Sequence, residues 1–233
     1  MDGLLRRSSR NYLRRHPGQL TLAWTTGIRK PYVAPFQFFL LANVVFFVVQ
    51  WATGENVFSS SLDSHLHHQD WSELARSFLS RRLEATHMTV AQYESTFDRA
   101  VVLNAKSLIL LMTVPFSMLL PLAFLRERLP FMTHVVFSLH LYAFLLLLFC
   151  LALVAARLSA LVGFGGLDNP IVDDVLTVAN LAACSAYLYL AIYPVYGITG
   201  VRRLATTALL ALAVLAIVVG YRFLLFFVTL YGT

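Results

Sequence analysis

The sequence predicts an all-α polytopic membrane protein with about five transmembrane helices. Hydrophobic residues make up 58% of the 233 residues and charged residues 13%, and the mean hydropathy is +0.70. Soluble domains carry charge on roughly a quarter of their residues, so this composition excludes a soluble globular domain as well as a disordered chain. The length leaves room for one compact membrane domain and little room for a separate soluble one.

The first expected element is a basic amphipathic segment, residues 1–32, on the cytoplasmic surface. Seven of the eighteen Lys and Arg residues precede residue 31, and Leu20, Trp24 and Ile28 recur every four residues, as on the apolar face of a helix. A segment of this kind binds an anionic membrane surface. The net charge of +6 is therefore interpreted as a membrane anchor, and no nucleic-acid partner is expected.

Five apolar segments reach the length of about 20 residues that a helix needs to cross a bilayer. Within an expected transmembrane domain at 33–233, they cover residues 33–52, 103–125, 134–158, 172–196 and 204–231. Arginines stand in the short connections after the second and fourth segments, whereas three aspartates follow the third. The positive-inside rule then predicts a cytoplasmic N-terminus and a C-terminus outside. The expected location is a bacterial inner membrane, with a mitochondrial membrane as the alternative because the Arg-rich start also resembles a presequence.

An outer helical loop is expected at 53–102, where seven acidic residues stand against four basic ones. Thr89 and Gln92 have the spacing of a capping box, which predicts a helix that starts near residue 90 and runs on into the second span. Pro115 and Pro121 are expected to kink that span.

Five charged residues within or beside the spans are the main candidate site. Lys106, Arg157, Asp173, Asp174 and Arg222 all fall in the outer half of the predicted topology. Each charge costs about 2.5 to 3.5 kcal/mol at the centre of a membrane helix, so such residues mark functional sites or paired charges. Three interpretations remain open: ion pairs between helices, side chains that reach the interface without a partner, and a ligand or ion site. Three cations favour an anionic ligand.

Histidines in the outer loop are a second candidate site. His65, His67, His68 and His87 stand among carboxylates, and neutral imidazole is a ligand for Zn, Cu or Ni. The His-x-His-His spacing lacks the helical arrangement of known zinc motifs. The alternative is a solvated, metal-free histidine turn.

Other side chains in the spans receive structural interpretations. His134 and His140 are six residues apart, so they do not share a helix face, and no haem or metal partner is recognised for them. Cys150 and Cys184 lie in apolar segments, which excludes a framework disulfide as the expected role. Tyrosines at the end of the fourth span are interpreted as an interfacial belt: Tyr187, Tyr189, Tyr193 and Tyr196.

Two short motifs precede the first span: His16-Pro17-Gly18 and Arg29-Lys30-Pro31-Tyr32-Val33-Ala34-Pro35-Phe36. They resemble a large family of uncharacterised bacterial polytopic membrane proteins. The resemblance implies a basic N-terminal helix, an extended loop after the first span and a bacterial inner membrane, but no activity. Many members carry an N-terminal zinc ribbon. This chain has no cysteine before Cys150, so no ribbon role is implied.

Three functions are compatible with these features. The first is a non-enzymatic membrane protein that binds or passes a small anion, an ion or a lipid headgroup at the outer charged cluster. The second is a metal-binding protein or metal-dependent enzyme that uses the loop histidines with a divalent metal; otherwise no cofactor is expected. The third is an accessory subunit or scaffold. The expected partners are membrane lipids, with a protein partner or a second copy of the chain as further candidates.

Overall fold

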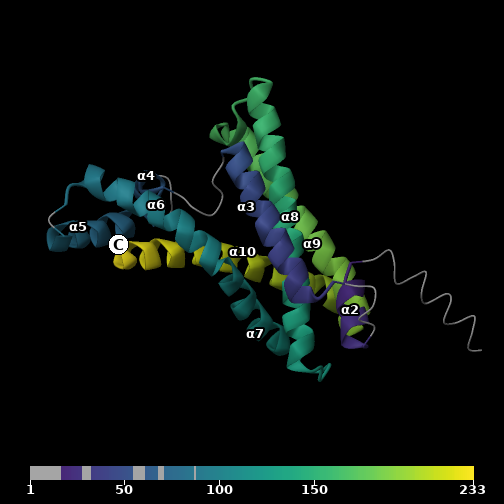
Figure 1. Ribbon diagram of the computed structural model, residues 1–233. Coiled ribbons are helices and arrows are strands. Elements are labelled where there is room, and N and C mark those ends of the chain that lie inside the picture. Colours follow the sequence, from purple (N-terminus) through teal and green to yellow (C-terminus); the bar gives the residue numbers. More distant parts are fainter. Residues whose placement is uncertain (1–16, 28–32, 55–60, 68–70, 87) are drawn as a thin grey trace, which may run out of the picture. The chain divides into compact units, whose positions relative to one another are not determined.

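The computed structural model describes residues 17–27, 33–54, 61–67, 71–86 and 88–233, and every regular element in these ranges is a helix. The helices, labelled in Figure 1, divide into two compact units. Unit 1 comprises Met1–Gly54 and Thr113–Leu215, and unit 2 comprises Glu55–Met112 and Ala216–Thr233. The last helix contributes to both units.

The all-α class is confirmed in the described residues, and several helices have the length and composition of membrane spans. Among the described residues, four helices are long and apolar enough to cross a membrane: α3 (Pro35–Thr53), α8 (Phe131–Leu161), α9 (Pro170–Tyr196) and α10 (Gly200–Gly232). The count reaches five when the broken helix that precedes α8 is taken as one span. These five elements correspond to the five expected segments.

The second expected span is not one continuous helix. Its residues belong to α6 (Val90–Leu108), the 3₁₀ turn η1 (Ile109–Met112) and α7 (Thr113–Ala123). The predicted capping box at the start of α6 is confirmed, because the Thr89 backbone N–H donates to Gln92 Oε1 at 3.2 Å and the Thr89 side chain caps the N3 amide. Pro115 explains the break, since its ring clashes with the carbonyl four residues earlier, at Leu111 in η1.

Helix α8 is the centre of unit 1. It packs against α3, α7, α9 and the 3₁₀ turn η2 (Gly166–Asp168), and Figure 1 shows α3, α8 and α9 side by side. Side chains such as Phe39, Phe46, Leu141 and Leu188 are almost completely buried between these helices. Because α8 is surrounded on several faces, most of its first half is buried, including polar residues.

The short helix α2 (Gln19–Thr25) packs against α8 and α9. Gly18 precedes it with φ +88°, and a Cβ at this position would lie 2.8 Å from the Ala191 carbonyl oxygen. The buried residues of α2 are Gln19, Thr21 and Ala23, whereas Leu20, which the apolar periodicity assigned to the membrane-binding face, is 41% exposed. Small and polar residues of α2 are therefore the ones that are buried against the other helices.

Unit 2 contains α4 (Leu62–His67), α5 (Ser72–Thr86), α6, η1 and the last part of α10. Hydrogen bonds connect α6 to α10. The Tyr93 hydroxyl donates to the Leu230 carbonyl at 2.8 Å, and the Tyr221 hydroxyl donates to the Ala105 carbonyl at 2.9 Å. Both tyrosines are buried, so these bonds satisfy hydroxyl groups that would otherwise be costly to bury.

Candidate functional site

The charged connections of unit 1 fall at its two ends. Glu127, in the connection between α7 and α8, forms an ion pair with Arg202 near the start of α10, with Oε1 and Nη1 2.7 Å apart. The connection between α7 and α8, which contains Arg126 and Arg128, therefore lies at the same end of unit 1 as the start of α10, which contains Arg202 and Arg203. The far end of α8 leads through η2 into α9. The predicted separation of basic and acidic connections thus agrees with the helix arrangement within unit 1.

The far end carries three of the five predicted site residues. Arg157 lies about one turn before the end of α8, and Asp173 and Asp174 lie in the first two turns of α9. All three are exposed, and no ion pair joins Arg157 to either carboxylate within the described part of the chain. Ion pairing between helices, one of the three interpretations, is therefore not observed for these residues.

Local folding explains how the two helix ends meet. Gly166 in η2 lies directly on α8, where a Cβ would be 3.1 Å from the Ala156 carbonyl oxygen. Asn169 then caps α9, because its side-chain oxygen accepts from the Ile171 backbone N–H at 2.9 Å. Asp173 in the first turn also stabilises the helix through its favourable interaction with the helix dipole. The first carboxylate has a structural role in addition to any binding role.

The other two cations belong to unit 2. Lys106 lies in α6, and its side chain is outside the described residues. Arg222 lies in α10, is half-buried and is close enough to His65 to act on it electrostatically. Sequence reasoning assigned Arg222 to the charged cluster and His65 to the histidine cluster, yet these two lie together. A single five-residue cluster stays a prediction.

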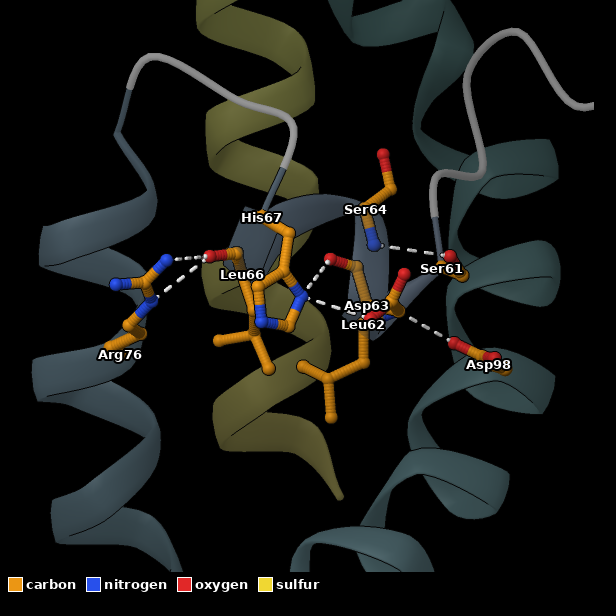
Figure 2. Close-up of polar contacts among 8 residues, drawn as sticks. All are labelled: Ser61, Leu62, Asp63, Ser64, Leu66, His67, Arg76 and Asp98. Carbon is orange, nitrogen blue, oxygen red and sulfur yellow. Dashed lines mark hydrogen bonds and ion pairs between the residues drawn. The ribbon is translucent and has the colours of Figure 1, made fainter. Parts of the chain in front are cut away.

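Helix α4 is held at both ends by side chains of neighbouring helices. Figure 2 shows that Asp98 of α6 accepts from the Leu62 backbone N–H at 2.9 Å. At the other end, Arg76 of α5 donates from Nε and Nη2 to the Leu66 carbonyl at 3.0 and 2.8 Å. Both contacts satisfy backbone groups that a helix leaves without an internal partner. They fix the direction in which each histidine of α4 points.

His65 points into the core of unit 2. It is 1% exposed, and its ring centroid lies 4.9 Å from Phe226 and 6.1 Å from both Trp71 and Phe97. Burial, followed by the charge of Arg222, lowers the pKa of His65 from 6.5 to about 4. The expected solvated turn is thus wrong for this residue. Leu62, His65 and Leu66 have i, i+3, i+4 spacing, which was the available signal for a buried helix face.

His67 lies on the opposite, exposed side of α4. Its Nδ1 is 2.9 Å from Asp63 Oδ1, an i, i+4 pair drawn in Figure 2. His68 and His87 lie outside the described residues. Among all the described residues, those of α4 included, no three His, Cys, Asp or Glu side chains are grouped to hold a metal ion. The metal hypothesis stays a prediction.

Two buried histidines of α8 have partners that the sequence did not reveal. His134 Nδ1 lies 3.0 Å from the Tyr196 hydroxyl in α9, and His140 Nδ1 lies 2.8 Å from Thr21 Oγ1 in α2. Their spacing correctly predicts that they face different neighbours. No periodicity marks Thr21, because it stands on the polar side of α2. These bonds connect α8 to α9 and to the N-terminal helix, so their clearest role is structural.

Comparison with known proteins gives one match. Residues 2–47 match a family model described as a protein of unknown function (DUF3667). The match covers α2 and most of α3, which is the part of the chain that carried the sequence resemblance. No curated protein and no solved structure matches the chain. The comparisons therefore indicate similarity to an uncharacterised family and no activity.

Proposed function

We propose that the protein is a non-enzymatic multi-pass protein of the bacterial inner membrane, with a cytoplasmic N-terminus, that binds a small anion, an ion or a lipid headgroup at its outer end. One observation carries this proposal. Arg157 and the carboxylates of Asp173 and Asp174 stand exposed around one helix connection, without an ion pair between them among the described residues.

The charges at this connection suit a lipid headgroup best. An arginine guanidinium donates two parallel hydrogen bonds to a phosphate. Two nearby carboxylates attract a primary ammonium, such as the one in phosphatidylethanolamine. A zwitterionic headgroup therefore offers a partner to Arg157 and to Asp173 and Asp174 at the same time, whereas a simple anion is repelled by the carboxylates. Lys106 and Arg222 remain further candidate cations.

Transport by alternating access fits this chain less well than binding. Many secondary transporters are built from two structural repeats, and five spans do not divide into two equal halves. Binding without translocation requires only the helix connection that carries the charges. The proposal therefore assigns no conformational cycle to the protein.

Native mass spectrometry of the purified full chain tests the proposal. Phosphatidylethanolamine is titrated against the wild type and against Arg157→Ala, and the double change Asp173→Asn with Asp174→Asn is measured in parallel. We expect each variant to bind about tenfold more weakly, because each loses one or more charge-assisted contacts. Arg126→Ala, an exposed arginine at the other end of unit 1, is the matched control and should bind as the wild type does. Unchanged affinity in both test variants would contradict the proposal.

A further inference from the structure

Arg203, near the start of α10, is held against α9 by two different contacts. Its Nε donates to the Tyr189 backbone carbonyl at 2.6 Å. Its guanidinium carbon lies 3.8 Å from the centroid of the Tyr189 ring and 5.5 Å from that of Tyr193. The stacked contact is a cation–π interaction. Together the two contacts fix both the position and the plane of the guanidinium.

The sequence around the end of α9 explains this arrangement. Tyr189 and Tyr193 are four residues apart, so they share one face of the helix. Pro194 stands inside α9 and has no N–H to bond the carbonyl four residues earlier, at Leu190, so the helix is distorted next to Tyr189. Gly197 then ends the helix with φ +69°, and the chain turns into α10 at Gly200. This short turn brings Arg203 back alongside Tyr189.

The contacts leave the outer edge of the guanidinium available. Arginine carries five N–H donors, and the bond to Tyr189 uses the one on Nε. Within the described residues, no side chain or carbonyl accepts from Nη1 or Nη2 of Arg203. These two groups form the fork that binds two oxygens of a phosphate. Because the side chain is already ordered, binding a phosphate requires little further loss of conformational entropy.

The surroundings of Arg203 favour a ligand with net negative charge. Arg128 and Arg202 belong to the same end of unit 1, and the ion pair with Glu127 compensates only Arg202. The positive end of the α10 helix dipole also lies here, and the first turn of α10 contains no acidic residue that would compensate it. A choline or ethanolamine ammonium would be repelled at this end, whereas an anionic headgroup would not.

We propose that Arg203, Tyr189 and Tyr193 form a binding site for the phosphate of an anionic phospholipid in the leaflet that faces the predicted cytoplasmic side. Tyr189 and Tyr193 are 40% and 50% exposed, so their rings are available to the acyl and glycerol region beside the headgroup. The site lies at the other end of unit 1 from Arg157; its leaflet rests on the topology of the proposed function, but its ligand does not depend on the site at Arg157.

Native mass spectrometry of the full chain in detergent tests the site, with phosphatidylglycerol and phosphatidylcholine as the two probes. The wild type should bind phosphatidylglycerol more tightly than phosphatidylcholine. Arg203→Ala should weaken phosphatidylglycerol binding by about tenfold, and Tyr189→Leu should weaken it less. Arg203→Lys is the informative variant, because lysine keeps the charge but loses the planar fork, and it should bind as weakly as Arg203→Ala.

Arg126→Ala removes the same charge from the same end and is the matched control, with an expected change below about twofold. The site would be refuted if Arg203→Ala weakened binding no more than Arg126→Ala, or if Arg203→Lys bound as the wild type does.

Inorganic phosphate distinguishes the source of the ligand: full displacement of the lipid at low millimolar phosphate would overturn the assignment to a lipid. Thermal unfolding of each variant, followed by fluorescence, checks that it is folded. If Arg203→Ala were unfolded, wild-type affinity in Tyr189→Leu would refute the site.

Discussion

At the scale of single residues, Gly18 shows how closely the N-terminal helix approaches α9. A Cβ on Gly18 would lie 2.8 Å from the oxygen and 2.9 Å from the Cα of Ala191, and backbone atoms cannot move aside as a flexible side chain can. We predict that Gly18→Ala weakens the docking of α2 by about 1 to 3 kcal/mol, because strain at positive φ adds to the clash. Hydrogen exchange of the α2 amides measures this loss as reduced protection.

Gly27 supplies the control for that prediction. Its φ is +84°, but nothing lies within 4 Å of the position of its Cβ. Gly27→Ala therefore shares the backbone strain and lacks the clash. Protection of α2 should fall less than in Gly18→Ala. Equal loss in the two variants would show that the close approach to Ala191 does not stabilise α2.

His65 predicts a pH dependence of stability. Its pKa is lowered from 6.5 to about 4 by burial and by Arg222, so the unfolded state binds a proton at a higher pH than the native state does. This contribution to stability is complete above pH 6.5 and is lost as the pH falls towards 4, by about 3 kcal/mol in total. His65→Leu should remove it.

Fluorescence of Trp71 reports on this residue, because its ring lies 6.1 Å from that of His65. Unfolding is followed in a background of Trp24→Phe and Trp51→Phe at several pH values. The measured quantity is the difference in unfolding free energy between the wild type and His65→Leu. The contribution of carboxylate titration is common to both proteins and cancels in this difference. A difference that does not change between pH 7 and 4 would contradict the predicted pKa.

Single-residue environments were the least predictable part of the chain from its sequence. The sequence shows that His134 and His140 cannot share a face, but it does not show that Thr21 reaches His140. The partner is distant in sequence and stands on the polar side of α2. Arg203 was similarly seen only as a topology signal, because its stacking on Tyr189 depends on the geometry of the turn between two helices.

At the scale of elements, α4 depends on its two neighbours. A helix of six residues is too short to be stable alone, and Asp98 and Arg76 satisfy its end groups. Asp98→Ala should destabilise unit 2 by about 1 to 2 kcal/mol, the usual cost of losing a helix cap. Glu94→Ala, one turn earlier on α6, is the control and should have little effect. Hydrogen exchange at α4 checks both, and equal protection in the two variants would contradict the capping role.

The apolar helices were predictable because a helix that is long and apolar enough to cross a bilayer has a continuous apolar run of about 20 residues in the sequence. The expected segment 134–158 corresponds to Phe131–Leu161, and 172–196 corresponds to Pro170–Tyr196. Helix α4 was missed, since its six residues are mostly polar and its stability comes from Asp98 and Arg76. The break before α7 was predictable from Pro115, although its form as a 3₁₀ turn was not.

At the scale of the whole molecule, the alternative as a metal protein makes a separate prediction. The proposed function requires no metal, so elemental analysis of the full chain, purified without chelators, should find no stoichiometric Zn, Cu, Ni or Fe. Stoichiometric metal that is lost in His67→Ala would instead favour the histidine site. His67→Ala is suitable because this side chain is exposed and its removal does not disturb the core.

The charges in each helix connection predicted which residues share an end of unit 1. This was possible because a short connection keeps the end of one helix close to the start of the next. Arg157 near the end of α8 and Asp173 and Asp174 near the start of α9 flank one connection. For Arg222 and Lys106 the shared cluster stays a prediction. They belong to unit 2, and a similar expected depth in a membrane does not by itself specify which side chains lie near them.

Both binding proposals require the two ends of unit 1 to face opposite sides of the membrane. In a background of Cys150→Ser and Cys184→Ser, a single cysteine is placed at Val162, which is 73% exposed at the end of α8, or at Thr199, which is exposed before the start of α10. A membrane-impermeant maleimide is then added to intact spheroplasts. We predict labelling of Val162→Cys in intact spheroplasts and of Thr199→Cys only after the membrane is permeabilised. The reverse pattern, or labelling of both from one side, would contradict the account.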